Sequence, residues 1–259
     1  SDQGDAGGTI LASGTASTDR ANLIRWVRGE DNFADENTSG STTDIRASVH
    51  GDVLHSRPAV INYARFLKAD GVTKTDDDVF IFYGANDGLF HAIKGGYAVP
   101  SGDTSGLQPG QEAWGFIPQE FFGQFTRMRN NSPKIGSAFK RPYFMDGPIA
   151  VYTNDANGDG KIVAADGDRV ILYIGLRRGG RFIYAIDVSD PLDPKFMWKI
   201  SNATAGFSEL GETWSQTTVV QEGLSGYPKP VLVMGGGYDS TIEDLDPARV
   251  CAFDQLLVC

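Results

Sequence analysis

An internal repeat constrains the fold of this chain more than any other feature. The segments VFIFYGANDGLFHAIKGG and RVILYIGLRRGGRFIYAIDV each contain an apolar run that ends in glycine, a turn rich in glycine and polar residues, and a second apolar run. A third copy starts at VLVMGGG and reaches CAFD near the C-terminus. Internal repeats take precedence over local patterns because they define the structural unit. The aligned positions are Ala92, Ala185 and Ala252 in the second apolar run, with Trp114 and Trp198 in the run that follows the first two copies.

Each of the first two copies contributes four strands when the apolar run before it and the tryptophan-bearing run after it are counted, and the third copy stops before its tryptophan run. VLHSRPAVINY precedes the first copy, DGPIAVYT the second and TWSQTTVVQE the third. A repeated four-stranded unit with glycine and aromatic marks is typical of β-propeller blades. The copies are farther apart than the roughly 40 to 50 residues of an ordinary blade, which indicates long loops between strands. We therefore predict an all-β fold of four-stranded antiparallel blades.

About three blades are expected, and this number does not close a ring of about four to eight. An incomplete propeller leaves sheet edges open, so the sequence predicts an open arc that is a portion of a longer propeller. A twisted β-sandwich with accidental similarity between the copies is the alternative. The propeller portion is predicted to span residues 44–259, and residues 1–43 to be a flexible segment with one short helix. The apolar face of that helix is formed by Leu23, Ile24, Trp26 and Val27.

The composition excludes some classes of function. The formal net charge is −10, from 33 acidic and 23 basic residues, so phosphates of nucleic acids or anionic membranes would be repelled. No apolar run approaches the 18 residues that a membrane-spanning helix needs. An acidic balance does favour divalent cations. We expect neither nucleic-acid binding nor a membrane span.

The stretch NDANGDGKIVAAD predicts a calcium site inserted in the second blade. Calcium takes six to eight oxygen ligands, and a twelve-residue loop of EF-hand type supplies them from positions 1, 3, 5, 7 and 12 with glycine at position 6. Gly160 occupies position 6, where positive φ reverses the chain, and Ile162 at position 8 would anchor the loop to the core. The predicted ligands are Asp155, Asn157, Asp159, the carbonyl of Lys161 and Asp166.

Two features of this loop depart from the pattern. Position 12 is Asp166 rather than glutamate, and position 9 is Val163, so water or the nearby Asp168 would have to fill that place. Strands flank the loop instead of helices. The alternative is a turn rich in Asp and Asn on a polar hairpin, without a metal ion.

Other candidate residues are interpreted as structural, and no catalytic or cofactor-binding residue is predicted. The acidic run Asp76–Asp78 is expected to be a solvated strand entry. His50 and His55, around Asp52, fall on opposite sides of a strand and lack an evident third ligand. His91 is expected to pack inside its strand. Cys251 and Cys259 either form a disulfide or remain buried thiols, and two cysteines do not decide between these states.

The chain resembles the PilY/PilC family of type IV pilus biogenesis and adhesion proteins, at their C-terminal domain. The resemblance runs in order from about Asp44 to Asp239. It implies a β-propeller on the bacterial surface at the pilus tip or fimbrium, after transit through the periplasm or outer membrane, and a non-enzymatic protein. The motifs that carry it are DIRASVHGDVLHSRPAVINY, VFIFYGANDGLFHAIKGG, EAWGFIPQEFF, MDGPIAVY, GGRFIYAIDVSDP and VLVMGGGYD.

The resemblance also implies partners and a mode of regulation. It implies contact with minor pilins or other tip components, attachment to host or abiotic surfaces, and roles in twitching motility and virulence. It further implies that calcium gates pilus extension against retraction. The family's calcium loop lies in a later blade, so its role does not transfer to Asp155 by position. The integrin-binding Arg-Gly-Asp of some members is absent, since the similar triplet here is Arg28-Gly29-Glu30.

One enzymatic alternative remains open. The motif YGANDG followed by HA also occurs in quinone-dependent propeller dehydrogenases, so the chain could be a fragment of such an enzyme. That enzyme would hold calcium and pyrroloquinoline quinone at the centre of the ring. The calcium loop predicted here is local and lies on a hairpin insertion, which favours a regulatory or structural role.

Overall fold

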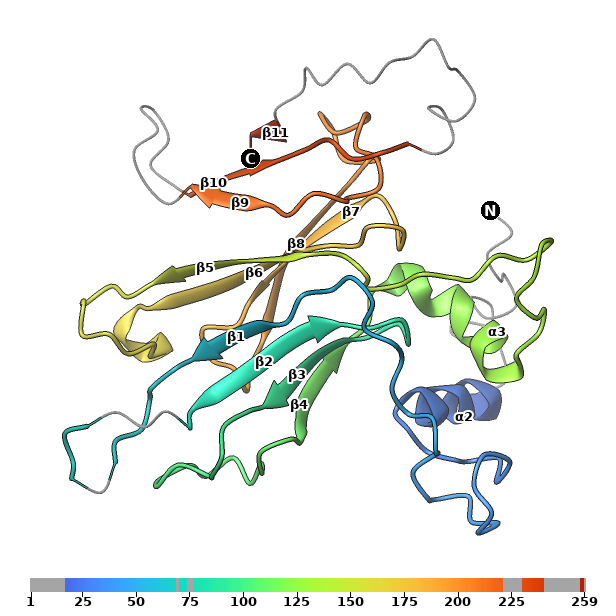
Figure 1. Cartoon of the computed structure of the whole chain (residues 1–259), viewed down its shortest axis with the longest axis horizontal. Helices are drawn as coiled ribbons and strands as arrows, with labels where there is room; N and C mark the ends of the chain where they lie inside the picture. The colour runs from blue at the N-terminus through green and yellow to red at the C-terminus, as the bar shows by residue number, and fades with distance from the viewer. Residues whose placement is uncertain (1–16, 69, 74–76, 221–229, 240–256, 259) are drawn as a thin grey trace.

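The protein is built mainly from antiparallel sheets, with few helices (Figure 1). The computed structural model describes residues 17–68, 70–73, 77–220, 230–239 and 257–258. Within these residues there are two four-stranded sheets and one three-stranded sheet. Every sheet is a meander of consecutive strands, without the crossed connections of a Greek-key sandwich. The predicted all-β class and its four-stranded antiparallel units are confirmed.

The strands follow one another in each sheet in chain order. The first sheet contains β1 (Ala59–Asn62), β2 (Val79–Gly84), β3 (Phe90–Lys94) and β4 (Glu112–Phe116). The second contains β5 (Ile149–Asn154), β6 (Arg169–Gly175), β7 (Phe182–Asp187) and β8 (Lys195–Ser201). The third contains β9 (Thr218–Val220), β10 (Val231–Met234) and β11 (Leu257–Val258).

The register of the strands reproduces the sequence repeat. Ala92 on β3 lies opposite Trp114 on β4, and Ala185 on β7 lies opposite Trp198 on β8. The register shifts by one residue directly after each of these alanines, so even the irregularity is repeated. The third alanine position, Ala252, lies outside the described residues, as do Cys251 and Cys259.

The two α-helices that the structure describes lie at one end of the sheets (Figure 1). The predicted short helix is α2 (Ser17–Val27), and its buried face is narrower than expected because Ile24 remains 43% exposed. A 3-10 helix, η1 (Gln119–Gln124), and α3 (Phe125–Asn130) follow β4 and were not predicted. The sequence feature that could have predicted these helices is the spacing of four between Phe121 and Phe125, which places both side chains on one helical face. Both side chains are buried. None of the helices described is long and apolar enough to cross a membrane.

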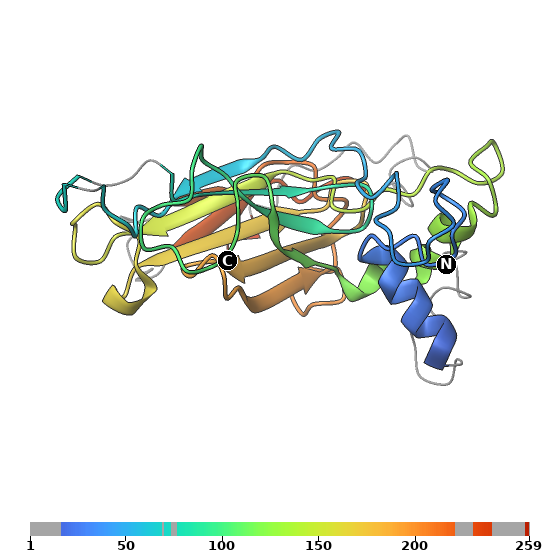
Figure 2. The same ribbon diagram turned by 90° about the horizontal axis from the view of Figure 1, so that it is seen from below.

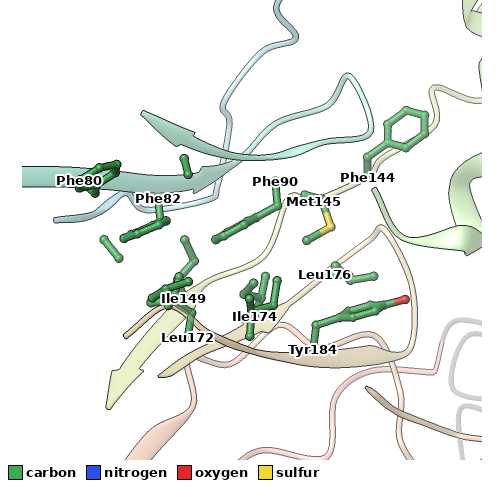
Figure 3. Close-up of a cluster of buried hydrophobic side chains, with 14 of the residues drawn as sticks. Phe80, Phe82, Phe90, Phe144, Met145, Ile149, Leu172, Ile174, Leu176 and Tyr184 are labelled. Atoms are coloured by element: carbon green, nitrogen blue, oxygen red, sulfur yellow. The ribbon is translucent and has the colours of Figure 1, made fainter. Parts of the chain in front are cut away.

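The main core fills the space between the first and second sheets. Phe80, Phe82 and Phe90 point from the first sheet toward aliphatic residues of the second (Figure 3). The view from below shows the strands as stacked, roughly parallel layers (Figure 2). Burying these aromatic side chains removes a large apolar area from water and so stabilises the contact between the two sheets. The facing residues of the second sheet include Ile149, Leu172 and Ile174.

Glycines at equivalent positions allow the chain to pass closely from one sheet to the next. Gly84 ends β2, and a Cβ there would lie 2.0 Å from the carbonyl oxygen of Met145. Gly175 ends β6, and a Cβ there would lie 3.0 Å from the carbonyl oxygen of Thr213. Met145 precedes β5 and Thr213 precedes β9, so each glycine faces the segment that enters the following sheet. The glycine of the repeat is therefore a packing requirement between sheets.

We predict that Gly84→Ala lowers the free energy of unfolding by about 1–3 kcal/mol, because the new methyl group meets backbone that cannot rotate away. Urea unfolding followed by tryptophan fluorescence measures the change. Gly136→Ala is the matched control, since a Cβ at that exposed position meets nothing within 4 Å. Equal stability of the two variants would contradict the conclusion that Gly84 is required for close packing between the sheets.

Candidate metal-binding sites

The predicted calcium loop connects β5 to β6 and is anchored to the first sheet. The amide of Ile162 donates to the carbonyl oxygen of Tyr63 at 2.9 Å, and the Ile162 side chain packs against the main core. The predicted anchoring role of Ile162 is confirmed. Gly158 and Gly160 have φ of 72° and 71°, so the chain reverses at Gly160 as predicted.

The side-chain oxygens at the first three predicted ligand positions organise the loop. The carboxylate of Asp155 accepts the amide hydrogens of Gly158 at 2.7 Å, Asp159 at 3.2 Å and Gly160 at 2.5 Å. The amide oxygen of Asn157 accepts the Asp159 amide hydrogen at 2.9 Å. A carboxylate has about four lone-pair positions, so these bonds leave capacity for a cation.

The two ends of the loop are joined by Asp168 rather than by Asp166. The buried carboxylate of Asp168 accepts the amide hydrogens of Ala156 and Val163, both at 2.8 Å. Asp166 ends the short 3-10 helix η2 (Ala164–Asp166) and is exposed. The sequence predicts Asp168 only as a substitute ligand, whereas in the fold Asp168 holds the loop closed because it reaches the amide of Ala156, twelve residues earlier.

The structure brings the predicted calcium ligands together in part. Asp155, Asn157 and Asp159 share one hydrogen-bonded turn. Among the described residues, however, only one group of three or more His, Cys, Asp or Glu side chains has all its ligand atoms within 4.8 Å of one another, and it lies elsewhere. In this conformation Asp166 therefore does not close on the other two carboxylates.

That group is His50, Asp87 and His91, at the turn between β2 and β3. His91 lies on β3, Asp87 in the turn, and His50 in the segment before β1. The His91 ring stacks on two other rings. Its centroid lies 4.7 Å from that of His50 and 5.2 Å from that of Tyr83. From the sequence these histidines are expected to be separate structural residues, because they are 41 positions apart and only tertiary folding brings them together.

The charge of His91 is controlled by two carboxylates. Its Nδ1 lies 2.6 Å from Glu112 Oε1, and its Nε2 lies 3.1 Å from Asp87 Oδ2. Burial lowers the pKa of His91, but hydrogen bonds and charge from Asp87 and Glu112 raise it more, to about 9. Burial raises the pKa of Asp87, but the hydrogen bond and positive charge of His91 and the backbone hydrogen bonds from Gly51 and Leu89 outweigh burial, so the pKa is lowered overall. Without a metal ion, His91 is an imidazolium paired with both acids at neutral pH.

The acidic run is not the solvated strand entry that was expected. Asp78 is fully buried and accepts two hydrogen bonds from the Arg65 guanidinium, both at 2.9 Å. The ammonium of Lys94, also fully buried, lies 3.5 Å from Asp78 and 3.0 Å from Asp103. A buried charge is tolerated only when it is paired, and Asp78 is neutralised by cations from two other segments. Asp76 lies outside the described residues.

Comparison with known proteins identifies the chain's relatives. No protein-family model matches it. Over 252 residues it is 29% identical to the type IV pilus biogenesis factor PilY1 of Pseudomonas aeruginosa strain UCBPP-PA14, covering 92% of this chain and 18% of that protein. Over 254 residues it is 24% identical to a PilY1 homologue of Xylella fastidiosa, with the same two coverages. A crystal structure of the P. aeruginosa PilY1 C-terminal domain matches 62% of this chain and 25% of its own chain, with 25% identity and a TM-score of 0.35.

The repeated four-stranded sheets and this similarity define the chain as a homologue of a segment of type IV pilus biogenesis factors. The relatives that carry the similarity are the PilY1 proteins, and the resemblance seen in the sequence motifs is confirmed. The chain spans about one fifth of the length of these relatives, at 18%.

We predict that Asp168→Ala destabilises the metal-free chain by about 1–3 kcal/mol, because two backbone amides lose their buried acceptor. The measurement is urea unfolding in the presence of a chelator. Asp166→Ala is the control, and its exposed side chain should change stability by less than about 0.5 kcal/mol. The reverse order of the two effects would mean that Asp166 closes the loop.

Proposed function

We propose that this chain is the propeller portion of a type IV pilus biogenesis factor and tip adhesin. The observation that carries the proposal is the similarity to PilY1 over 92% of the chain. In this role the protein acts on the bacterial surface, contacts minor pilins or other tip components, and attaches the cell to host or abiotic surfaces. It acts by assembly and binding rather than by catalysis, and it contributes to twitching motility and virulence.

We infer that calcium binds at Asp155, Asn157, Asp159, the Lys161 carbonyl and Asp166. The hydrogen bonds from loop amides to Asp155 and Asn157 support this, because they already hold oxygen ligands in a curled arrangement. Asp166 is exposed at the end of η2 and would have to turn inward when the ion binds. The buried Asp168 holds the two ends of the loop near one another in the absence of the ion.

Calcium at this loop would act on the junction between the first two sheets. The Ile162 amide donates a hydrogen bond to the Tyr63 carbonyl oxygen. The Tyr63 hydroxyl in turn donates to the Val188 carbonyl oxygen at 2.6 Å. Without calcium, mutual repulsion of the loop carboxylates opposes the ordered loop. Binding adds RT ln(1 + [Ca²⁺]/Kd) to stability, about 2.7 kcal/mol at a hundredfold excess over Kd. Extracellular modules bind calcium with Kd of about 10⁻⁴ to 10⁻³ M, so the calcium concentration outside the cell is sufficient to occupy such a site.

We expect Asp155→Ala with Asp159→Ala to abolish calcium binding, with a loss of at least tenfold in affinity by isothermal titration calorimetry. The matched control is Asp70→Ala. Asp70 also accepts backbone amides in an exposed turn, from Val72 at 2.9 Å and Thr73 at 2.8 Å, but is not a predicted ligand. Unchanged affinity in the double variant would place calcium elsewhere or nowhere on the chain.

The functional test places the same variants in the parent protein in its bacterium. Deleting the parent gene should reduce surface pili, twitching and attachment, and the double variant should change these three measurements while Asp70→Ala does not. Protein levels must be matched by immunoblot. A deletion without effect on pili would overturn the pilus role itself. A normal double variant beside a defective deletion would reduce the loop to a structural element.

A further inference from the structure

The group formed by His50, Asp87 and His91 has the composition and spacing of a transition-metal site. Among the described residues these are the three side chains whose ligand atoms all lie within 4.8 Å of one another. Asp87 and His91 lie four residues apart on the β2–β3 hairpin, and the fold brings His50 to them from the segment before β1. We propose that His50, Asp87 and His91 bind one divalent transition-metal ion of the zinc class.

The orientation of His91 supports metal ligation through Nε2. Glu112 Oε1 lies 2.6 Å from Nδ1 and so fixes the hydrogen on that nitrogen. A carboxylate behind the imidazole is the usual outer partner of a metal-binding histidine. Nε2 then faces Asp87 Oδ2 at 3.1 Å. Two ligands of a tetrahedral zinc ion with bonds of about 2.0–2.1 Å lie about 3.3 Å apart, so an ion fits this pair with little movement.

His50 is oriented in the same way. Its Nδ1 lies 2.6 Å from the Gly51 carbonyl oxygen, which accepts only if Nδ1 carries the hydrogen. The lone pair of His50 is therefore on Nε2, which lies 2.9 Å from the Tyr83 hydroxyl. His50 is exposed, so its ring can rotate from Tyr83 toward the ion. Both histidines thus offer Nε2, with Nδ1 held by an oxygen.

Asp87 is held in place by the backbone. Its Oδ2 accepts the Gly51 amide hydrogen at 2.8 Å, and its Oδ1 accepts the Leu89 amide hydrogen at 3.0 Å. Gly51 is required for this approach, because a Cβ there would lie 2.4 Å from the Asp87 nitrogen. The same residue therefore positions both Asp87 and the neighbouring His50.

The ligand types determine the kind of ion. Two imidazoles and a carboxylate suit zinc, copper, iron or nickel, whereas calcium prefers an all-oxygen site. Three protein ligands leave a fourth position, and the exposure of His50 opens it to solvent. An open fourth position filled by water is typical of reactive or exchangeable zinc sites rather than closed structural ones.

The test is calorimetric titration of the full chain with zinc chloride alone. The chain carries Cys251→Ser and Cys259→Ser to remove thiol ligands, has no histidine tag, and is saturated with calcium beforehand. We expect one zinc ion per chain. His50→Ala, at an exposed site that should not disturb folding, should weaken binding at least tenfold. Glu112→Gln should weaken it by about 10–100-fold while every proposed ligand remains.

The chain provides its own matched control, since it contains three histidines and His55 lies outside the group. His55→Ala should leave zinc affinity unchanged. Cobalt(II) added in place of zinc should give visible ligand-field bands that are present in His55→Ala and absent in His50→Ala. Absence of zinc binding by the parent chain, unchanged affinity in His50→Ala, or an equal loss in His55→Ala would each overturn the proposal.

Discussion

The close contact of backbone with backbone, where one sheet passes the chain to the next, is the constraint on which the structure depends. Gly84 lies against Met145, and the equivalent Gly175 lies against Thr213. A larger residue at Gly84 would push the first two sheets apart and open the aromatic core between them. The repeat therefore preserves glycine for a physical reason: it sets how closely successive sheets stack.

The same contact positions the turn that carries Asp87. Asn86, next to it, accepts the Phe144 amide hydrogen at 3.0 Å and donates to Asp146 at 3.3 Å, so the turn is fixed against the segment entering the second sheet. In the second sheet the corresponding turn contains Arg177, whose backbone forms an isolated antiparallel β-bridge with Thr213. Equivalent turns thus contact the segment entering the next sheet in both cases, but of the two only the first has a group of residues suited to a metal ion.

Local patterns made much of the fold predictable, and long-range contacts account for what was missed. The hairpins, the alanine–tryptophan positions and the reversal at Gly160 follow from neighbouring residues, whose periodicity is visible in the sequence. The burial of Asp78 depends on Lys94 and Arg65, which reach it only when β3 and the end of β1 are in place. The pairing of His50 with His91 likewise depends on Gly51 approaching the Asp87 turn.

The two candidate cation sites lie on different sheets and offer different ligand atoms. The loop after β5 offers carboxylate, amide and carbonyl oxygens at the surface, which suit a hard ion such as calcium. The cluster beside β3 offers imidazole nitrogens with a buried carboxylate, which suit a softer ion. The bond from Ile162 to Tyr63 ties the loop to the first sheet, while the cluster lies within that sheet at the β2–β3 turn. An ion at the loop would stabilise the junction between the first two sheets. An ion at the cluster would stabilise the β2–β3 turn, which is hydrogen-bonded to the segment that enters the second sheet. Ions at the two sites would thus stabilise neighbouring parts of the same interface.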